Sequence, residues 1–155
     1  MAEWPTEFLV RPAGVADVPA LFRIRTAVVE NVMTMAELAA LGITPSGIAA
    51  ALSHGEAVAW VALCEGREAG FSMVRPVEGD VFALFVLPTH EGRGIGRALL
   101  REAERWLAGR GMTEAWLCTG AEPGLRVPGF YRAAGWREAG RMSDGQLRFV
   151  RPLRG

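Results

Sequence analysis

The stretch VFALFVLPTHEGRGIGRALL, residues 81–100, combines an apolar strand, a glycine-rich turn and the beginning of a helix. Residues 81–87 carry no polar side chain, which is typical of a strand covered on both faces, and Pro88 ends the run. From Gly94 onward, apolar residues recur at helical spacing. A glycine-rich turn that enters a helix presents unpaired N–H groups and the positive end of the helix dipole. This stretch therefore predicts an anion site, with a phosphate as the usual guest.

The glycine spacing narrows the kind of phosphate ligand. The chain contains no lysine, which excludes a Walker A loop. The glycines read G-x-G-x-G, and Arg97 stands where a dinucleotide fingerprint would place its last glycine. Residues 91–96, EGRGIG, instead resemble the pyrophosphate-binding signature of the GNAT family of N-acetyltransferases, Q/R-x-x-G-x-G/A. Glu91 departs from that signature at its first position, but the family makes its phosphate contacts through backbone N–H groups.

A second motif carries the same resemblance. Residues 130–136 read FYRAAGW, and GNAT members often have F-Y-x-x-x-G-F/W here, with the tyrosine hydroxyl near the cofactor sulfur. The resemblance implies that Tyr131 is the general acid that protonates the departing thiolate. A phenol with a pKa of about 10 can hydrogen-bond a developing thiolate and return a proton to it. Taken alone, this residue would be read as an amphipathic aromatic near a helix surface.

The resemblance also implies which residues hold acetyl-CoA as the cosubstrate. In the family the fourth and fifth strands splay apart, and the pantetheine arm enters between them. Backbone groups of Leu84, Phe85 and Val86 would pair with that arm as they would with an added strand. The residues implied in the phosphate contacts are Gly92, Arg93, Gly94, Ile95, Gly96 and Arg97.

Acetyl transfer to an amine also requires a base, or a water chain leading to one, that removes the amine proton. Some family members place a glutamate at the start of the central strand, and Asp80 occupies that position here. Asp80 is therefore a candidate base, and a turn residue after Gly79 is an equally good interpretation. Other members use a glutamate on the fifth strand, where this chain has Thr119. The weaker candidates are Glu30, Glu78, His54 and His90.

The remaining pattern predicts the element order β-αα-β-β-β-α-β-α-β-β. Strands are expected at residues 8–12, 57–64, 69–75, 81–87, 115–118, 136–141 and 146–151. A first helix, capped by Asp17, keeps apolar spacing from Leu21 to Val32, and residues 65–68 form a hairpin turn. The fold class is α/β (α+β), a single GNAT-like domain over residues 1–155 whose central sheet is mixed, mostly antiparallel and covered by helices on both faces.

Composition excludes several classes of partner. Lys+Arg and Asp+Glu both total 17, so the net charge is zero and nothing requires nucleic acid or an anionic membrane. The two cysteines, Cys64 and Cys118, lie far apart in apolar runs. We therefore expect both to be buried free thiols, and we expect no metal site. No signal peptide and no apolar stretch of bilayer length is present, which indicates a cytoplasmic protein.

The sequence thus predicts an acetyl-CoA-dependent N-acetyltransferase that acts by direct transfer to a primary amine of a small molecule or peptide. A non-catalytic acetyl-CoA-binding sensor or scaffold is the alternative. Thr119 stands where some members have a fifth-strand glutamate, and Gly124 stands where many members have an asparagine that contacts the cofactor. The sequence does not decide whether the protein forms a homodimer. Residues expected near the acceptor are Arg25, Glu30, Asn31, Met33, Glu122 and Arg126.

Overall fold

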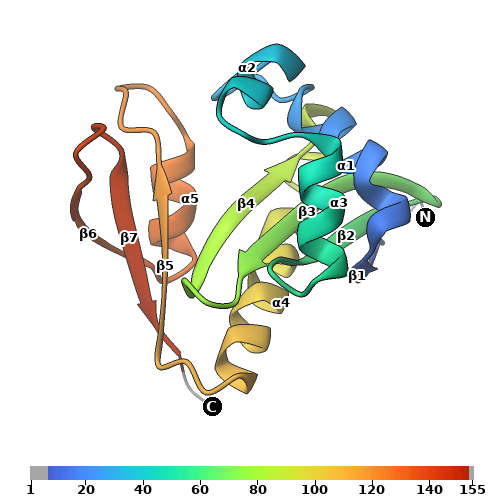
Figure 1. The fold of residues 1–155 in the computed structure, drawn as a ribbon. Helices are drawn as coiled ribbons and strands as arrows, with labels where there is room; N and C mark the ends of the chain where they lie inside the picture. The colour runs from blue at the N-terminus through green and yellow to red at the C-terminus, as the bar shows by residue number, and fades with distance from the viewer. Residues whose placement is uncertain (1–6, 154–155) are drawn as a thin grey trace, which may run out of the picture.

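Seven strands form one sheet in the structure, a computed structural model that describes residues 7–153 (Figure 1). The strands are β1 (Leu9–Ala13), β2 (Val58–Cys64), β3 (Arg67–Arg75), β4 (Asp80–Val86), β5 (Glu114–Thr119), β6 (Arg137–Arg141) and β7 (Leu147–Pro152). The helices are α1 (Val18–Arg25), α2 (Met35–Ala40), α3 (Pro45–Ser53), α4 (Ile95–Gly109) and α5 (Val127–Ala133), with short 3-10 turns at Val15–Asp17 and Pro88–His90. All the predicted strands form, with ends that shift by one or two residues.

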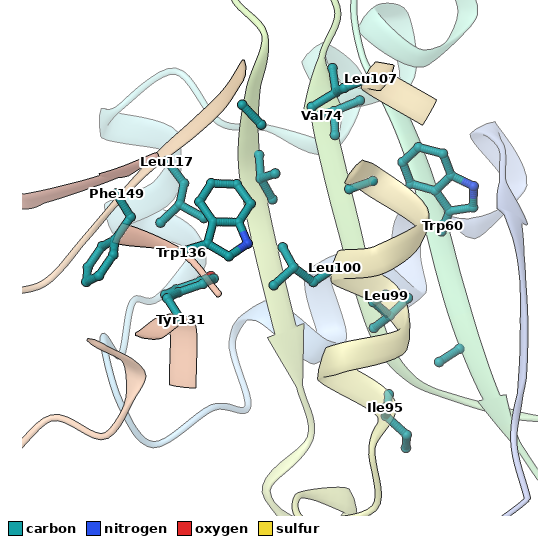
Figure 2. Packing of buried hydrophobic residues seen from close by; sticks show 14 of the residues in the cluster. Trp60, Val74, Ile95, Leu99, Leu100, Leu107, Leu117, Tyr131, Trp136 and Phe149 are labelled. Carbon is teal, nitrogen blue, oxygen red and sulfur yellow. The ribbon is translucent and has the colours of Figure 1, made fainter. Parts of the chain in front are cut away.

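The sheet order is β1-β2-β3-β4-β5-β7-β6, and every pairing is antiparallel except β4 with β5. Alternate side chains of β2 and β3 pack against opposite layers. Trp60 and Ala62 belong to the core under α4, whereas Ala59 and Phe71 pack with α1. Figure 2 shows α4 directing its buried leucines toward this core. The predicted mixed, mostly antiparallel sheet with helices on both faces is confirmed.

The sheet is split between β4 and β5. These two strands pair at a single position, Asp80 with Trp116, and then diverge (Figure 1). Beyond that position β5 pairs only with β7. The splay that the family resemblance implied is therefore present. A strand covered on both faces was the wrong expectation beyond Val81, because Phe82 is 38% exposed and Ala83 to Leu87 are only half-buried.

The first helix is shorter than its residue spacing predicts. It was expected to reach Val32, but α1 ends at Arg25, where Thr26 Oγ1 donates to the Phe22 carbonyl at 2.8 Å. The chain then runs irregularly to α2, with Asn31 at a left-handed φ of 58°. Val32 is 60% exposed, so its helical spacing is not a sign of burial.

Asp17 precedes α1 without capping it. Its carboxylate accepts from the N–H of Gly14 at 2.8 Å and from the Arg11 guanidinium at 2.9 and 3.0 Å. These Arg11 hydrogen bonds hold the pKa of Asp17 below its usual value. The predicted cap was wrong because the ion pair and the preceding 3-10 turn use the carboxylate.

The β2–β3 hairpin turns in two residues rather than the predicted four. Cys64 pairs directly with Arg67, and Glu65 and Gly66 between them have φ values of 51° and 79°. Two consecutive positive φ values give the tight turn whose twist matches paired strands.

No helix within residues 7–153 is long and apolar enough to cross a bilayer.

Candidate active site

A cavity of about 1000 Å³ lies where β4 and β5 separate. Its walls come from α1, the segment between α1 and α2, β4, the glycine loop, β5 and the start of α5. The cavity therefore joins parts of the two stretches that the sequence singled out, residues 81–100 and 130–136.

The glycine loop forms one end of this cavity and has the backbone geometry of an anion cradle. Gly92 and Gly94 have φ values of 79° and 87°, and a Cβ added to either would meet no protein atom within 4 Å. Gly94 is the N-cap of α4, and no side chain caps this helix. Within residues 7–153, none of the six N–H groups of residues 92–97 donates to a backbone carbonyl or a side chain. Unbonded N–H groups at the positive end of a helix dipole suit a phosphate group.

The open edge of β4 continues the cavity from that loop. Leu84, Phe85 and Val86 all line it, and their strand is paired on its other edge with β3. Because β5 has left the sheet at this height, the β4 backbone groups that face it have no strand partner. An extended ligand arm could therefore pair here as a strand does.

Tyr131 lies on α5 at the inner wall of the cavity. Tyr131 is 5% exposed, and its ring lies near Trp136 and Phe149 (Figure 2). The centroid distances from this ring to those of Phe130, Trp136 and Phe149 are 5.2 to 6.1 Å. Burial raises the pKa of Tyr131 above its usual value, so the phenol stays protonated at neutral pH. The hydroxyl forms no hydrogen bond within residues 7–153, yet no fully enclosed side-chain N or O atom there lacks a partner. The hydroxyl therefore opens onto the cavity that Tyr131 lines.

Asp80 lies at the single bridge between β4 and β5 and also lines the cavity. Its carboxylate accepts two hydrogen bonds from Arg75, at 3.0 and 2.7 Å. Arg75 also stacks over Phe82, with its guanidinium carbon 4.7 Å from the ring centroid. Asp80 is thus a buried ion-pair partner rather than a free turn residue, and it remains a candidate base.

A bridge of three charged residues joins separate segments at the cavity wall. Arg126, just before α5, donates to Glu30 at 2.9 Å and to Glu91 at 3.0 Å. The backbone N–H of Arg126 also donates to the Glu30 carboxylate. Glu91, the residue that departs from the family signature, is thereby held by an arginine from another part of the chain.

Most of the residues expected near the acceptor meet at this cavity. Arg25, Glu30, Asn31, Met33 and Arg126 line it, whereas Glu122 lines a separate, smaller cavity. The weaker base candidates divide. Glu30 and His90 line the main cavity, and His54 and Glu78 do not.

Sequence reasoning missed the accessibility of Cys118. It was expected to be buried like Cys64, but it is only partly buried and lines the cavity because β5 faces the opening. Burial nevertheless raises the pKa of the Cys118 thiol. The apolar run around it gave no signal of this exposure.

Comparison with known proteins identifies the family. A family model described as the acetyltransferase (GNAT) family matches residues 21–136, and the chain belongs to that family. A search of curated proteins returned no match.

Solved structures of known acetyltransferases share the fold. The PaiA N-acetyltransferase of Thermoplasma acidophilum, in complex with coenzyme A, has a TM-score of 0.81 at 13% identity, covering 95% of this chain and 99% of that one. The ribosomal-protein-S18-alanine N-acetyltransferase of Escherichia coli has a TM-score of 0.73 at 19% identity, covering 96% of both chains. A GNAT-family putative acetyltransferase of Desulfovibrio desulfuricans has a TM-score of 0.79 at 19% identity, covering 96% of this chain and 100% of that one.

Proposed function

We propose that the protein is an acetyl-CoA-dependent N-acetyltransferase that moves the acetyl group directly to a primary amine. The observation that carries this proposal is the continuous cavity that runs from the uncapped N-terminus of α4, along the open edge of β4, to Tyr131. The Thermoplasma acidophilum neighbour, whose structure contains coenzyme A, supports the choice of cosubstrate.

The chain's own residues divide the work in this proposal. The N–H groups of residues 92–97 bind the pyrophosphate, and the side chains of Arg93 and Arg97 add positive charge beside it. The backbone of Leu84, Phe85 and Val86 orients the pantetheine arm. Acetyl-CoA supplies an activated thioester, so the protein must position the amine and manage two protons.

Tyr131 is the proposed general acid, because its protonated hydroxyl opens onto the cavity. Asp80 is the proposed base, directly or through a water. Its two oxygens offer about four acceptor sites, and Arg75 uses two of them.

Two measurements test this function. Calorimetric titration with acetyl-CoA should give micromolar binding, about −8 kcal/mol, with NADH and ATP as controls that do not bind. Thiol release from acetyl-CoA should then depend on an added primary amine. Failure of acetyl-CoA to bind would contradict the proposed pyrophosphate site. Binding without thiol release for any amine would favour the non-catalytic sensor.

Substitution of Tyr131 by phenylalanine tests the acid. Tyr131→Phe should leave the acetyl-CoA affinity nearly unchanged while lowering kcat by roughly 10²- to 10⁴-fold, because it removes only the proton donor. Its thermal stability should stay close to that of the wild type, since the hydroxyl has no partner within residues 7–153. Unchanged kcat would remove Tyr131 from the mechanism.

A further inference from the structure

Arg25 is a buried cation in the part of the cavity lined by α1 and the segments that follow it. It is the last residue of α1 and is only 9% exposed. Its guanidinium carbon lies 4.3 Å from the centroid of the Phe85 ring, on the α1 side of the sheet. Its Nη1 donates to the Asn31 carbonyl at 3.0 Å.

Within residues 7–153, Arg25 pairs with no carboxylate. Of the acidic residues that line the same cavity, Glu30 and Glu91 are bound by Arg126 and Asp80 is bound by Arg75, while Asp144 lies in the β6–β7 turn and accepts from the N–H of Gln146. Burial lowers the pKa of Arg25, and no neighbouring charge offsets that effect. Keeping a guanidinium out of water without a counter-charge is unfavourable, so a site that does so favours an anionic ligand.

The hydrogen-bonding capacity of Arg25 is mostly unused. A guanidinium has five N–H donors, and the structure shows one bond, to Asn31. Because no fully enclosed side-chain nitrogen in residues 7–153 lacks a partner, the unbonded Nε and Nη2 atoms are open to the cavity that Arg25 lines. Nε and Nη2 form the planar fork that binds a carboxylate with two parallel hydrogen bonds.

The walls around Arg25 are mostly apolar. The apolar cavity residues contributed by α1, α2, α3 and their connections are Leu21, Phe22, Val28, Val29, Met33, Leu38, Ile43 and Ile48. The polar ones besides Arg25 are Glu30, which Arg126 binds, and Asn31, whose carbonyl accepts from Arg25. A cation in a mostly apolar wall matches a ligand that carries one anionic group and an apolar side chain.

We infer that this part of the cavity binds an apolar amino acid as the acetyl acceptor, with Arg25 holding its carboxylate and the α1–α3 wall holding its side chain. This inference rests on the proposed acetyl transfer, because it names the acceptor of that reaction. A purely structural Arg25 would use only its bond to Asn31 and would be indifferent to the ligand's charge.

The test compares amino acids with their carboxamides. L-leucine, L-methionine and L-phenylalanine, and the amide of each, are titrated calorimetrically into CoA-saturated protein. The wild type should bind each acid more tightly than its amide, and Arg25→Gln should reduce that preference by about 10- to 100-fold. Comparing the same ligand pairs in two proteins cancels the different amine pKa values of acid and amide.

Two further variants control the comparison. Arg23 is a nearby arginine that is bound to Glu68, and its side chain is 47% exposed and does not line the cavity. The Arg23→Gln variant should therefore prefer acids over amides as strongly as the wild type does. Arg25→Lys keeps the charge but loses the planar fork, so its preference should fall between those of the wild type and Arg25→Gln. Thermal unfolding and CoA affinity establish that each variant is folded. If Arg25→Gln does not fold, the comparison of acid preference between the wild type and Arg25→Lys tests the inference.

The outcomes separate this inference from the proposed function. The inference is overturned if Arg25→Gln prefers the acids over the amides as strongly as the wild type does. If Arg25→Gln does not fold, the same result in Arg25→Lys overturns it. It is also overturned if none of the three amino acids binds. The inference is also overturned if amines that lack a carboxylate cause thiol release at equal rates in the wild type and in Arg25→Gln. That result would leave the proposed acetyl transfer intact. An Arg25-dependent acid preference without thiol release upholds the carboxylate site and contradicts acetyl transfer.

Discussion

Asp80 and Arg75 form a two-point ion pair at the beginning of β4, and this pair makes a mechanistic assignment testable. If Asp80 accepts the amine proton, its charge matters beyond its bond to Arg75. If it only anchors the strand, either partner can be removed with the same result. The two residues therefore offer a matched pair of substitutions.

We expect Asp80→Asn to lower kcat by roughly 10²- to 10⁴-fold, and Arg75→Gln to lower it much less. Both substitutions disrupt the ion pair, but only the first removes the proton acceptor. Steady-state kinetics at saturating acetyl-CoA, together with thermal unfolding of both variants, provides the comparison. Equal losses of kcat would assign Asp80 a positioning role and direct the search for the base to Glu30 or His90, which also line the cavity.

At the scale of elements, the glycine loop leads directly into a helix that is anchored along its length, as the proposed pyrophosphate site requires. Helix α4 is anchored along its length by Ile95, Leu99 and Leu107, each no more than 1% exposed. The buried Ser72 hydroxyl of β3 also donates to the Leu99 carbonyl at 3.1 Å. The helix N-terminus is therefore held in place before any ligand arrives, which reduces the entropy cost of binding.

Substitution of Gly94 by alanine should weaken acetyl-CoA binding at least tenfold. The new Cβ would project into the open space of the cradle, and the φ of 87° would strain the backbone by about 1–2 kcal/mol. Gly66→Ala is the matched control, because Gly66 has a similar φ of 79° and equally open surroundings but lies in the β2–β3 turn. Both variants should lose similar stability. Calorimetry showing equal acetyl-CoA affinities in the two would mean that the loop does not bind the pyrophosphate.

At the scale of the whole molecule, the bridge through Arg126 joins three segments that are far apart in the sequence. The hydrogen bonds from Arg126 hold the pKa of Glu30 below its usual value, although partial burial opposes this. A lowered folded-state pKa means that Glu30 stabilises the fold above its unfolded pKa of about 4.3. That stabilisation is lost as the pH falls through the lowered value.

Glu30→Gln should therefore be less stable than the wild type at neutral pH, and the difference should shrink below about pH 4.3. Urea unfolding of both proteins between neutral and acidic pH would measure this difference in the free energy of unfolding. Glu138→Gln is the control, because the Glu138–Arg132 ion pair lies on the exposed surface and should contribute less than about 1 kcal/mol. A difference for Glu30→Gln that stays constant with pH would indicate that the shape of Glu30, rather than its charge, stabilises the fold.

Local patterns predicted those parts of the fold that local interactions determine. Residues 95–109 form a helix as their spacing indicates, and the glycine-rich turn leads into it at Gly94. For Arg25, by contrast, the local sequence gives no signal that the side chain is buried. Its burial depends on Phe85, sixty residues later, and spacing within a helix cannot reveal such a contact.

The irregular segment after α1 has a similar explanation. Val28 and Val32 continue the helical spacing, but Glu30 between them binds Arg126, 96 residues away. Asn31 adopts a positive φ in the same segment and accepts from Arg25. Interactions across the cavity thus override the local propensity for a helix, and they are found where the proposed acceptor site lies.

The single bridge between β4 and β5 also bears on which strand edges another chain can reach. A strand edge with unpaired N–H and C=O groups invites aggregation when another chain can reach it. Here the two additional free edges face each other across the cavity, while the outer edges carry Pro12 on β1 and the exposed, charged strand β6. The unpaired part of β4 therefore lies inside the split sheet rather than at its outer edge.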